Sequence, residues 1–136
     1  VFWCMQQEIR QMLAQEPREG RRGAIVNTSS GAAIVPAPGA PHYTAAKHGG
    51  GGITKVAAQE YMDRGIRCNS VLPGVIDTPM TADVDEAMLA PLVMMTPLGR
   101  QWTAEEVADS ARFLASSESS CITGQWISPN GGLITI

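Results

Sequence analysis

The first sixteen residues carry apolar side chains at the spacing of one helix face. The apolar positions are Val1, Met5, Ile9, Met12 and Leu13. Glutamine, glutamate and arginine fill the positions between them, which favours an amphipathic helix. Pro17 disfavours helical backbone at the residue before it, so we expect this helix to stop near Glu16. No capping residue precedes the pattern, and we expect the chain to begin inside a helix, at the cut end of a longer protein.

Three short apolar runs predict buried strands. The first is Ala24–Ser30, the second is Ile66–Leu72, and the third lies within 124–132. Glycine, proline or small polar residues bound each run, as is usual at strand ends. The segment 31–41 between the first run and the next helix is rich in glycine, proline and alanine and is expected to be a loop.

Further helices are predicted between these strands. The segment 42–63 has an apolar face and should end at Gly65. That face consists of Ile53, Val56, Ala57, Tyr61 and Met62. Thr103, followed three residues later by Glu106, forms a capping box, so the last helix should begin there. The proline-containing segment 75–102 is expected to be mobile, with one or two short helices.

The predicted order of elements is helix, strand, helix, strand, irregular segment, helix, strand. Short apolar strands that alternate with helices indicate the α/β class, with a doubly wound parallel sheet of about three strands and flanking helices. Three strands are few for such a sheet, and the first strand should have at least one bare edge. The chain has 136 residues and a hydrophobic fraction of 44%, which suffice for a buried core.

Charge and cysteine content narrow the class of protein. The formal net charge is −3 and no basic block occurs, so we expect no nucleic acid and no anionic membrane surface as a partner. No apolar run approaches the roughly 18 residues that a membrane span needs. The cysteines, Cys4, Cys68 and Cys121, lie far apart and form no metal-binding motif, so we expect no metal. Unpaired buried thiols favour a reducing, cytoplasmic location.

Candidate catalytic residues gather where the predicted strands end. Ser29 and Ser30 end the first strand, Tyr43 and Lys47 open the next helix, and the segment 73–78 leaves the second strand. Ligands bind beyond the carboxyl ends of strands in open parallel sheets. A lysine ammonium one helical turn from a phenol lowers the pKa of that phenol, which suits it to proton transfer near neutral pH. Alcohol and carbonyl interconversion would then need a hydride donor, which implies a nicotinamide cofactor.

The pair Tyr43 and Lys47 alone leaves two interpretations open. A Tyr-x-x-x-Lys spacing also occurs on ordinary surface helices, where it has no catalytic role. His42 and His48 flank the pair and could act as proton relays. We favour the alternative, in which they are solvated or capping residues. The four glycines at 49–52 follow no strand, so they do not form a phosphate-binding loop, and we expect them to lie within the helix.

Four motifs in order resemble the C-terminal half of the short-chain dehydrogenase/reductase family. They are NTSS, YTAAK, GIRCNSVLPGVIDTPM and PLGRQWTAEEVADSARFLASSESSCITGQWISPNGG. The resemblance covers essentially the whole chain. It implies that residues 1–136 are the C-terminal catalytic half of one Rossmann-like domain whose dinucleotide-binding half is absent. It further implies an oxidoreductase that uses NAD or NADP to interconvert an alcohol and a ketone or aldehyde on a small-molecule substrate.

The same resemblance assigns roles to individual residues. Tyr43 would be the general acid and base, and Lys47 would lower the pKa of that phenol and bind the nicotinamide ribose. Ser30, thirteen residues before the tyrosine, would polarise the substrate oxygen, and Ser29 fits that spacing less well. The cofactor would also contact Pro73, Gly74, Val75, Ile76 and Thr78. The segment 79–98 would cover the substrate.

Departures from the family pattern leave a second interpretation open. No glycine-rich dinucleotide fingerprint precedes Ser30, and the family's catalytic asparagine would fall before Val1. The chain could therefore be a truncated, inactive relative that serves as an interaction or oligomerisation module. By resemblance, the helices at 1–16 and 42–64 would form a homodimer, extended in some members to a homotetramer. Gly52 is expected to pack closely, whereas Trp102 has no explanation from the sequence.

Overall fold

The computed structural model describes residues 1–135. Its helices are α1 (Phe2–Leu13), α2 (Pro41–Tyr61), α3 (Pro79–Ala82), α4 (Glu86–Met95) and α5 (Ala104–Ala115). Its strands are β1 (Gly23–Thr28), β2 (Ile66–Val71) and β3 (Trp126–Ile127). Three short 3-10 turns accompany them, η1 (Gly31–Ala33), η2 (Met62–Arg64) and η3 (Ser117–Ser119). The predicted order of helices and strands is confirmed.

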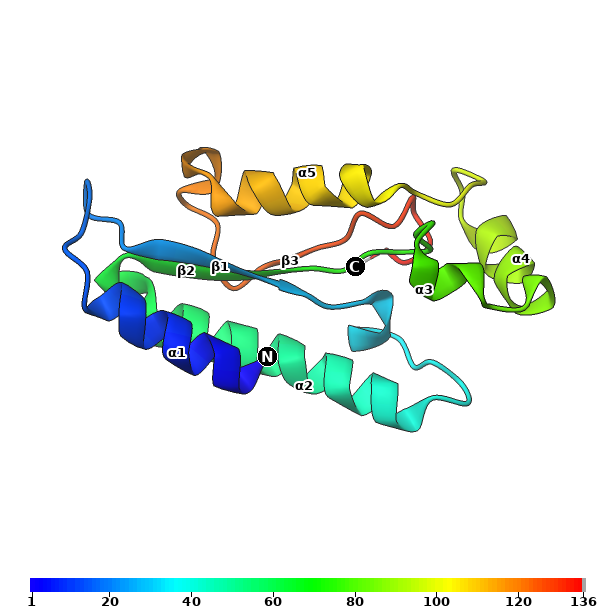
Figure 1. Ribbon diagram of the computed structural model, residues 1–136, viewed down its shortest axis with the longest axis horizontal. Helices are drawn as coiled ribbons and strands as arrows, with labels where there is room; N and C mark the ends of the chain where they lie inside the picture. The colour runs from blue at the N-terminus through cyan, green and yellow to red at the C-terminus, as the bar shows by residue number, and fades with distance from the viewer. Residues whose placement is uncertain (136) are drawn as a thin grey trace.

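The three strands form one parallel sheet in the order β1-β2-β3. The β1–β2 register runs from Gly23 opposite Ile66 to Thr28 opposite Val71, and Trp126 of β3 lies opposite Ser70. Helices α1 and α2 lie side by side on one face of this sheet, and α5 covers the other face (Figure 1). The predicted α/β class with a parallel sheet is confirmed. Among residues 1–135, no strand pairs with the outer edge of β1.

The main core lies between the sheet and the helix pair α1–α2. Its buried members are Met5, Ile9, Ile25, Ala57, Ala58, Ile66 and Cys68. The predicted apolar face of α2 is partly wrong, because Val56 and Met62 are more than half exposed. Ala57 is buried as predicted, and Ile53 and Tyr61 pack against the core. The face of α2 that meets the sheet adds the small side chains of Thr54 and Ala58. Small residues let a helix approach a sheet closely, so this contact covers a narrower stripe than the apolar pattern spans.

Several predicted boundaries are corrected in detail. Helix α1 ends at Leu13, three residues before the predicted stop at Glu16, and a hydrogen bond from Gln15 N to Met12 O turns the chain. The predicted loop 31–41 contains the turn η1. The prediction of one or two short helices after β2 is confirmed by α3 and α4.

The capping box that opens α5 is present as predicted. The Thr103 Oγ1 atom accepts a hydrogen bond from Glu106 N at 3.3 Å, and a Glu106 carboxylate oxygen accepts one from Thr103 N at 2.9 Å. Two backbone N–H groups that have no partner inside the helix are thereby satisfied. No helix among the described residues is both long and apolar enough to cross a membrane.

The glycine run lies inside α2, as predicted, but a different glycine makes the close contact. A Cβ atom at Gly51 would lie 2.4 Å from the Trp126 indole, whereas one at Gly52 would meet no atom within 4 Å. The expectation that Gly52 packs closely is therefore wrong for the contacts within this chain. The reason is rotational, because Gly51 shares the sheet-facing side of α2 with Thr54 and Ala58, whereas Gly52 is exposed.

Candidate active site

The predicted site residues come together at the carboxyl edge of the sheet. Strand β1 ends at Thr28 and continues into Ser29 and Ser30, which precede η1. The segment 73–78 leaves β2 at the same edge, and α2 begins beyond it (Figure 1). Parallel strands all end at one edge, so elements far apart in the sequence meet there.

Lys47 is held at this edge by backbone carbonyl groups. Its Nζ atom donates to Ser29 O at 3.1 Å and to Thr28 O at 3.3 Å. The same atom lies 5.4 Å from the centroid of the Tyr43 ring, one helical turn earlier. An ammonium group carries three hydrogens, so these two bonds leave one for a further acceptor. Tyr43 itself is 40% exposed, which leaves its ring accessible from solvent.

The two serines have different environments. The Ser30 Oγ atom accepts a hydrogen bond from Ala32 N at 3.2 Å and caps η1, so the structure joins it neither to Tyr43 nor to Lys47 by a hydrogen bond. Its hydroxyl hydrogen remains available to donate. Ser29 is only 8% exposed, and its hydroxyl has no hydrogen-bond partner in the described structure. Burying a hydroxyl without a hydrogen-bond partner costs folding free energy. The spacing of residues in the sequence does not indicate which hydroxyl is buried in this way.

A cavity of about 140 Å³ lies behind Lys47 and Ser29. Polar side chains on its wall are joined through Thr54, whose Oγ1 atom accepts from Asn27 Nδ2 at 2.9 Å and from Ser70 Oγ at 3.2 Å. Thr54 in turn donates to Gly50 O at 2.9 Å. The volume of the cavity leaves room for an ordered water molecule. Ser29 is one of the residues on its wall.

The segment 73–78 is held by backbone hydrogen bonds to Trp102. Trp102 N donates to Val75 O at 3.0 Å, and Asp77 N donates to Trp102 O at 2.8 Å. Gly74 must be glycine here, because a Cβ atom would lie 2.9 Å from the Asn130 Cα atom. The segment therefore has one defined path along the carboxyl edge.

The end of the same segment is fixed by threonine side chains. The Thr81 Oγ1 atom donates to Ile76 O at 2.6 Å and accepts from Thr78 N at 3.0 Å. Thr78 is the N-cap residue of α3. The predicted cofactor residues from Pro73 to Thr78 thus form a continuous, hydrogen-bonded strip beside the sheet.

Trp102 acquires a structural role that its sequence position did not reveal. Its backbone holds the segment 73–78, and its ring occupies the space where a Gly131 Cβ atom would be, at 2.8 Å. The Arg100 guanidinium lies 4.3 Å from the ring centroid and donates to both Glu106 carboxylate oxygens, at 2.9 and 2.6 Å. Arg100 therefore makes structural contacts with both Trp102 and Glu106.

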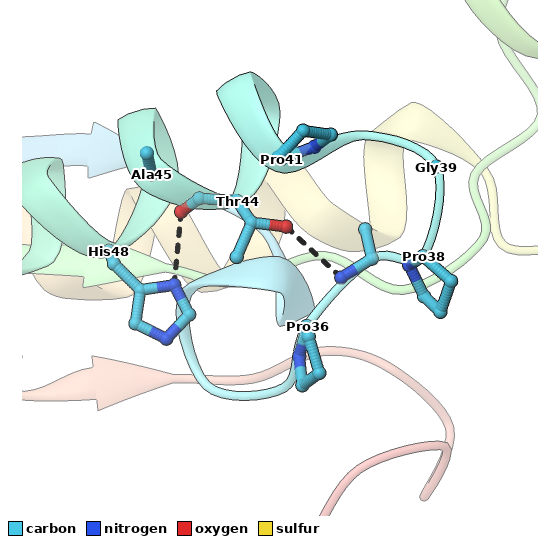
Figure 2. Close-up of a pocket in the computed structure, with 8 residues that line it drawn as sticks. Pro36, Pro38, Gly39, Pro41, Thr44, Ala45 and His48 are labelled. Atoms are coloured by element: carbon cyan, nitrogen blue, oxygen red, sulfur yellow. Dashed lines mark hydrogen bonds between the residues drawn. The ribbon is translucent and has the colours of Figure 1, made fainter.

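A wider pocket of about 580 Å³ opens at the start of α2 (Figure 2). Its wall consists of Pro36, Ala37, Pro38, Gly39, Pro41, Thr44, Ala45 and His48. Its polar groups bond to one another, since Thr44 Oγ1 accepts from Ala37 N at 3.1 Å and the His48 Nδ1 atom lies 3.0 Å from Thr44 O. His48 is exposed, in agreement with the favoured interpretation of a solvated residue. Within residues 1–135, no cluster of three His, Cys, Asp or Glu side chains could hold a metal ion.

Comparison with known proteins identifies the family of this chain. The family model described as enoyl-(acyl carrier protein) reductase matches residues 1–134. The chain belongs to the short-chain dehydrogenase/reductase family. Among relatives in this family, a 3-oxoacyl-(acyl carrier protein) reductase from Thermotoga maritima is 44% identical over 93% of this chain and 51% of its own length.

Other relatives of the short-chain dehydrogenase/reductase family differ in the substrates that they are named for. A cyclohexanol dehydrogenase from an Acinetobacter species is 45% identical over 91% of this chain and 46% of its own length. The human (3R)-3-hydroxyacyl-CoA dehydrogenase is 46% identical over 84% of this chain and 44% of its own length. The chain therefore spans about half the length of the curated relatives that it matches.

Solved structures support the same fold. An Agrobacterium tumefaciens protein described as a 2-deoxy-D-gluconate 3-dehydrogenase, solved with NADP bound, superposes with a TM-score of 0.89 at 34% identity. The match covers 97% of this chain and 53% of that protein. A 3-oxoacyl-(acyl carrier protein) reductase from Brucella melitensis superposes with a TM-score of 0.83 at 42% identity, over 94% of this chain and 46% of that protein. The sheet described above is thus the Rossmann-like sheet of this family.

Proposed function

We propose that this chain forms the catalytic side of a cytoplasmic, NAD(P)-dependent oxidoreductase that interconverts an alcohol and a ketone or aldehyde. The observation that carries the proposal is the placement of Lys47. Its ammonium is tied to the Thr28 and Ser29 carbonyls and lies 5.4 Å from the centroid of the Tyr43 ring. A phenol, a hydroxyl donor and an anchored cation at one sheet edge suit proton transfer to and from an alcohol oxygen.

The residues of this edge fit a nicotinamide nucleotide. Lys47 has one ammonium hydrogen left for a ribose hydroxyl, and the strip from Pro73 to Thr78 presents an ordered backbone along the same edge. Lys47, Tyr43 and the strip 73–78 would hold the nicotinamide end. When bound, the cofactor supplies the hydride that no side chain can supply. The relative from Agrobacterium tumefaciens was solved with NADP, and we propose NAD or NADP for this chain.

Each catalytic side chain has one task in this proposal. Tyr43 gives its phenolic proton to the substrate oxygen during reduction and takes it back during oxidation. Ser30 donates its free hydroxyl hydrogen to the same oxygen and so orients the carbonyl group. Lys47 places a positive charge one helical turn from the phenol and has an ammonium hydrogen left for the nicotinamide ribose. The relatives' names span a small uncharged alcohol and acyl thioesters, and all of these substrates share an alcohol–carbonyl pair.

The test is the Tyr43→Phe variant of the complete gene product that carries this chain. Loss of the transferable proton should lower kcat/KM by about 100-fold to 10,000-fold without changing the fold. Tyr61→Phe is the matched control, because Tyr61 lies at the far end of the same helix. A Tyr43→Phe enzyme that keeps more than a third of its activity would refute the assigned role.

A second proposal concerns association through α1 and α2. A groove of about 530 Å³ runs between these helices, and its apolar wall includes Phe2, Ile53 and Val56. Phe2 and Val56 are both more than half exposed. An apolar surface of this kind favours a homodimer, or a homotetramer that contains it, and would equally serve an inactive oligomerisation module.

Sedimentation velocity tests whether the protein associates through this groove, and a carbonyl-reduction assay tests whether the associated protein is an enzyme. Val56→Glu should shift the complete gene product towards monomer, because a carboxylate would be buried against an apolar surface. Glu60→Gln is the matched control on the rim of the same groove. A wild-type protein that dimerises but reduces no carbonyl compound with NADH or NADPH would favour the oligomerisation module over the enzyme.

A further inference from the structure

The segment that contains α3 and α4, residues 79–98, exposes a dense set of large apolar side chains. Its exposed members are Met80, Val84, Met88, Leu92, Met94, Met95 and Leu98. Met80 and Met94 are 85% and 84% exposed, and α4 contains no buried residue. Apolar side chains in such a density mark a surface that contacts something else. Methionine suits this use, because its flexible thioether adapts to ligands of different shape.

This segment borders the candidate active site. It follows directly from the strip 73–78, and the hydrogen bond from Thr81 Oγ1 to Ile76 O ties the start of α3 to that strip. Figure 1 shows α3 and α4 beyond the carboxyl edge of the strands, at the end of the sheet where α2 begins. An apolar ligand of the active site would therefore lie beside these methionines.

The charged side chains in the stretch 68–99 are all acidic. No lysine, arginine or histidine occurs from residue 68 to residue 99. Four carboxylates occur in that stretch, Asp77, Asp83, Asp85 and Glu86. The stretch therefore carries a formal charge of −4 at neutral pH.

Lys47 at the carboxyl edge and Arg100, which follows this stretch, are already engaged. The Lys47 ammonium is bonded to two backbone carbonyls, and the Arg100 guanidinium is bonded to both oxygens of Glu106. Arg22 and Arg67 instead lie at the amino ends of β1 and β2, on the opposite edge of the sheet. A phosphate group that approached residues 75–98 would thus meet carboxylates without a matching cation from this chain.

We propose that this active site takes small, uncharged, apolar alcohols and ketones, and disfavours acyl thioesters of phosphate-bearing carriers such as coenzyme A. The inference rests on the proposed oxidoreductase function and specifies its substrate class. The exposed methionines favour an apolar body on the substrate. The four carboxylates disfavour a chain of phosphates leading out of the site.

A matched pair of ketones tests the charge argument with the complete gene product. Ethyl 3-oxobutanoate and acetoacetyl-CoA carry the same 3-oxo group, but only the second carries phosphates. With NADH or NADPH at low ionic strength, we expect kcat/KM to be at least about tenfold higher for the neutral ester. Added salt should narrow the difference, because it screens the repulsion between phosphate and carboxylate.

The outcomes are distinguishable. Equal or better use of acetoacetyl-CoA at low salt would overturn the substrate class and leave the oxidoreductase function standing. If no carbonyl compound is reduced with either cofactor, the proposed function fails and this inference fails with it. Asp83→Lys should raise kcat/KM for acetoacetyl-CoA by at least about threefold, whereas Asp63→Lys at the opposite edge should not.

A series of 2-ketones from butanone to octanone tests the apolar argument. We expect kcat/KM to rise by about two- to fourfold for each added methylene group. Met94→Gln should flatten this dependence on chain length. Met62→Gln is the matched control, because Met62 is an equally flexible exposed side chain in η2, away from the site. The role of the methionines would be refuted by a wild type without such a slope, and equally by a Met94→Gln variant whose slope matches the wild type.

Discussion

Four consecutive glycines in α2 allow the effect of close packing to be compared at neighbouring positions of one helix. A Cβ atom at Gly49 or Gly50 would meet no atom within 4 Å, whereas one at Gly51 would lie 2.4, 3.0 and 3.3 Å from three atoms of the Trp126 ring. Alanine stabilises a helix interior by about 1 kcal/mol relative to glycine. The same substitution, glycine to alanine, should therefore change stability in opposite directions at neighbouring positions.

The expected magnitude follows from these distances. Ordinary contact begins near 3.4 Å, so the Trp126 ring would have to retreat by about 1 Å to admit the new methyl group. Lys55 restricts that movement, because its ammonium lies 3.9 Å from the ring centroid. Overpacking of this kind costs about 1–3 kcal/mol. We expect Gly49→Ala and Gly50→Ala to raise the free energy of unfolding by about 0.5–1 kcal/mol, and Gly51→Ala to lie about 1–3 kcal/mol below them.

Urea unfolding of the three variants, followed by circular dichroism, measures these differences. A double-mutant cycle with Trp126→Leu isolates the contact, because a smaller side chain at 126 should remove most of the penalty at Gly51. If Gly51→Ala were as stable as Gly49→Ala, the close approach of α2 to β3 would be wrong. If all three variants were destabilised, the run would have a role other than packing.

Three further predictions concern individual side chains. The Arg100 guanidinium lowers the pKa of the Glu106 carboxyl group to about 2, below its usual value near 4.3. The ionised Glu106 should therefore stabilise the fold above about pH 4.3, and this contribution should be lost as the pH falls towards 2. Urea midpoints measured against pH should fall less in Glu106→Gln than in the wild type. Burial raises the pKa of Cys68 to about 11, so a thiol reagent at pH 8 should modify two thiols in the native protein and the third only after unfolding. Arg67 donates to three backbone carbonyls and one hydroxyl, so Arg67→Ala should lower the free energy of unfolding by about 2–4 kcal/mol, and a loss below 1 kcal/mol would contradict that role.

Local patterns predicted the elements well where they involved neighbours in the chain. The capping box at Thr103, the glycine at 65 and the i, i+4 pair of Tyr43 and Lys47 depend on residues within one or two helical turns, and the structure contains each of them. The stop of α1 was misplaced by three residues, because Pro17 sets only an outer limit for a helix.

Long-range contacts were harder to predict. The sequence offered no sign that Trp102 holds the strip 73–78, since that contact joins residues almost thirty positions apart. Gly52 was favoured over Gly51 as the packed glycine, because a resemblance aligns positions but does not show which of them faces Trp126. Val56 was placed in the core from its apolar character, although its side of α2 faces away from the sheet.

By itself, the sequence determined the α/β order, the family motifs and the placement of Tyr43 and Lys47 on one helix face. Helix and strand periodicity are properties of short segments, so they can be read from the chain directly. Only the tertiary structure decided the anchoring of Lys47 on the β1 carbonyls, the burial of the Ser29 hydroxyl and the choice of Gly51 as the packed glycine. Those features depend on how closely and at what rotation a helix meets a sheet, and packing between residues distant in the sequence sets both.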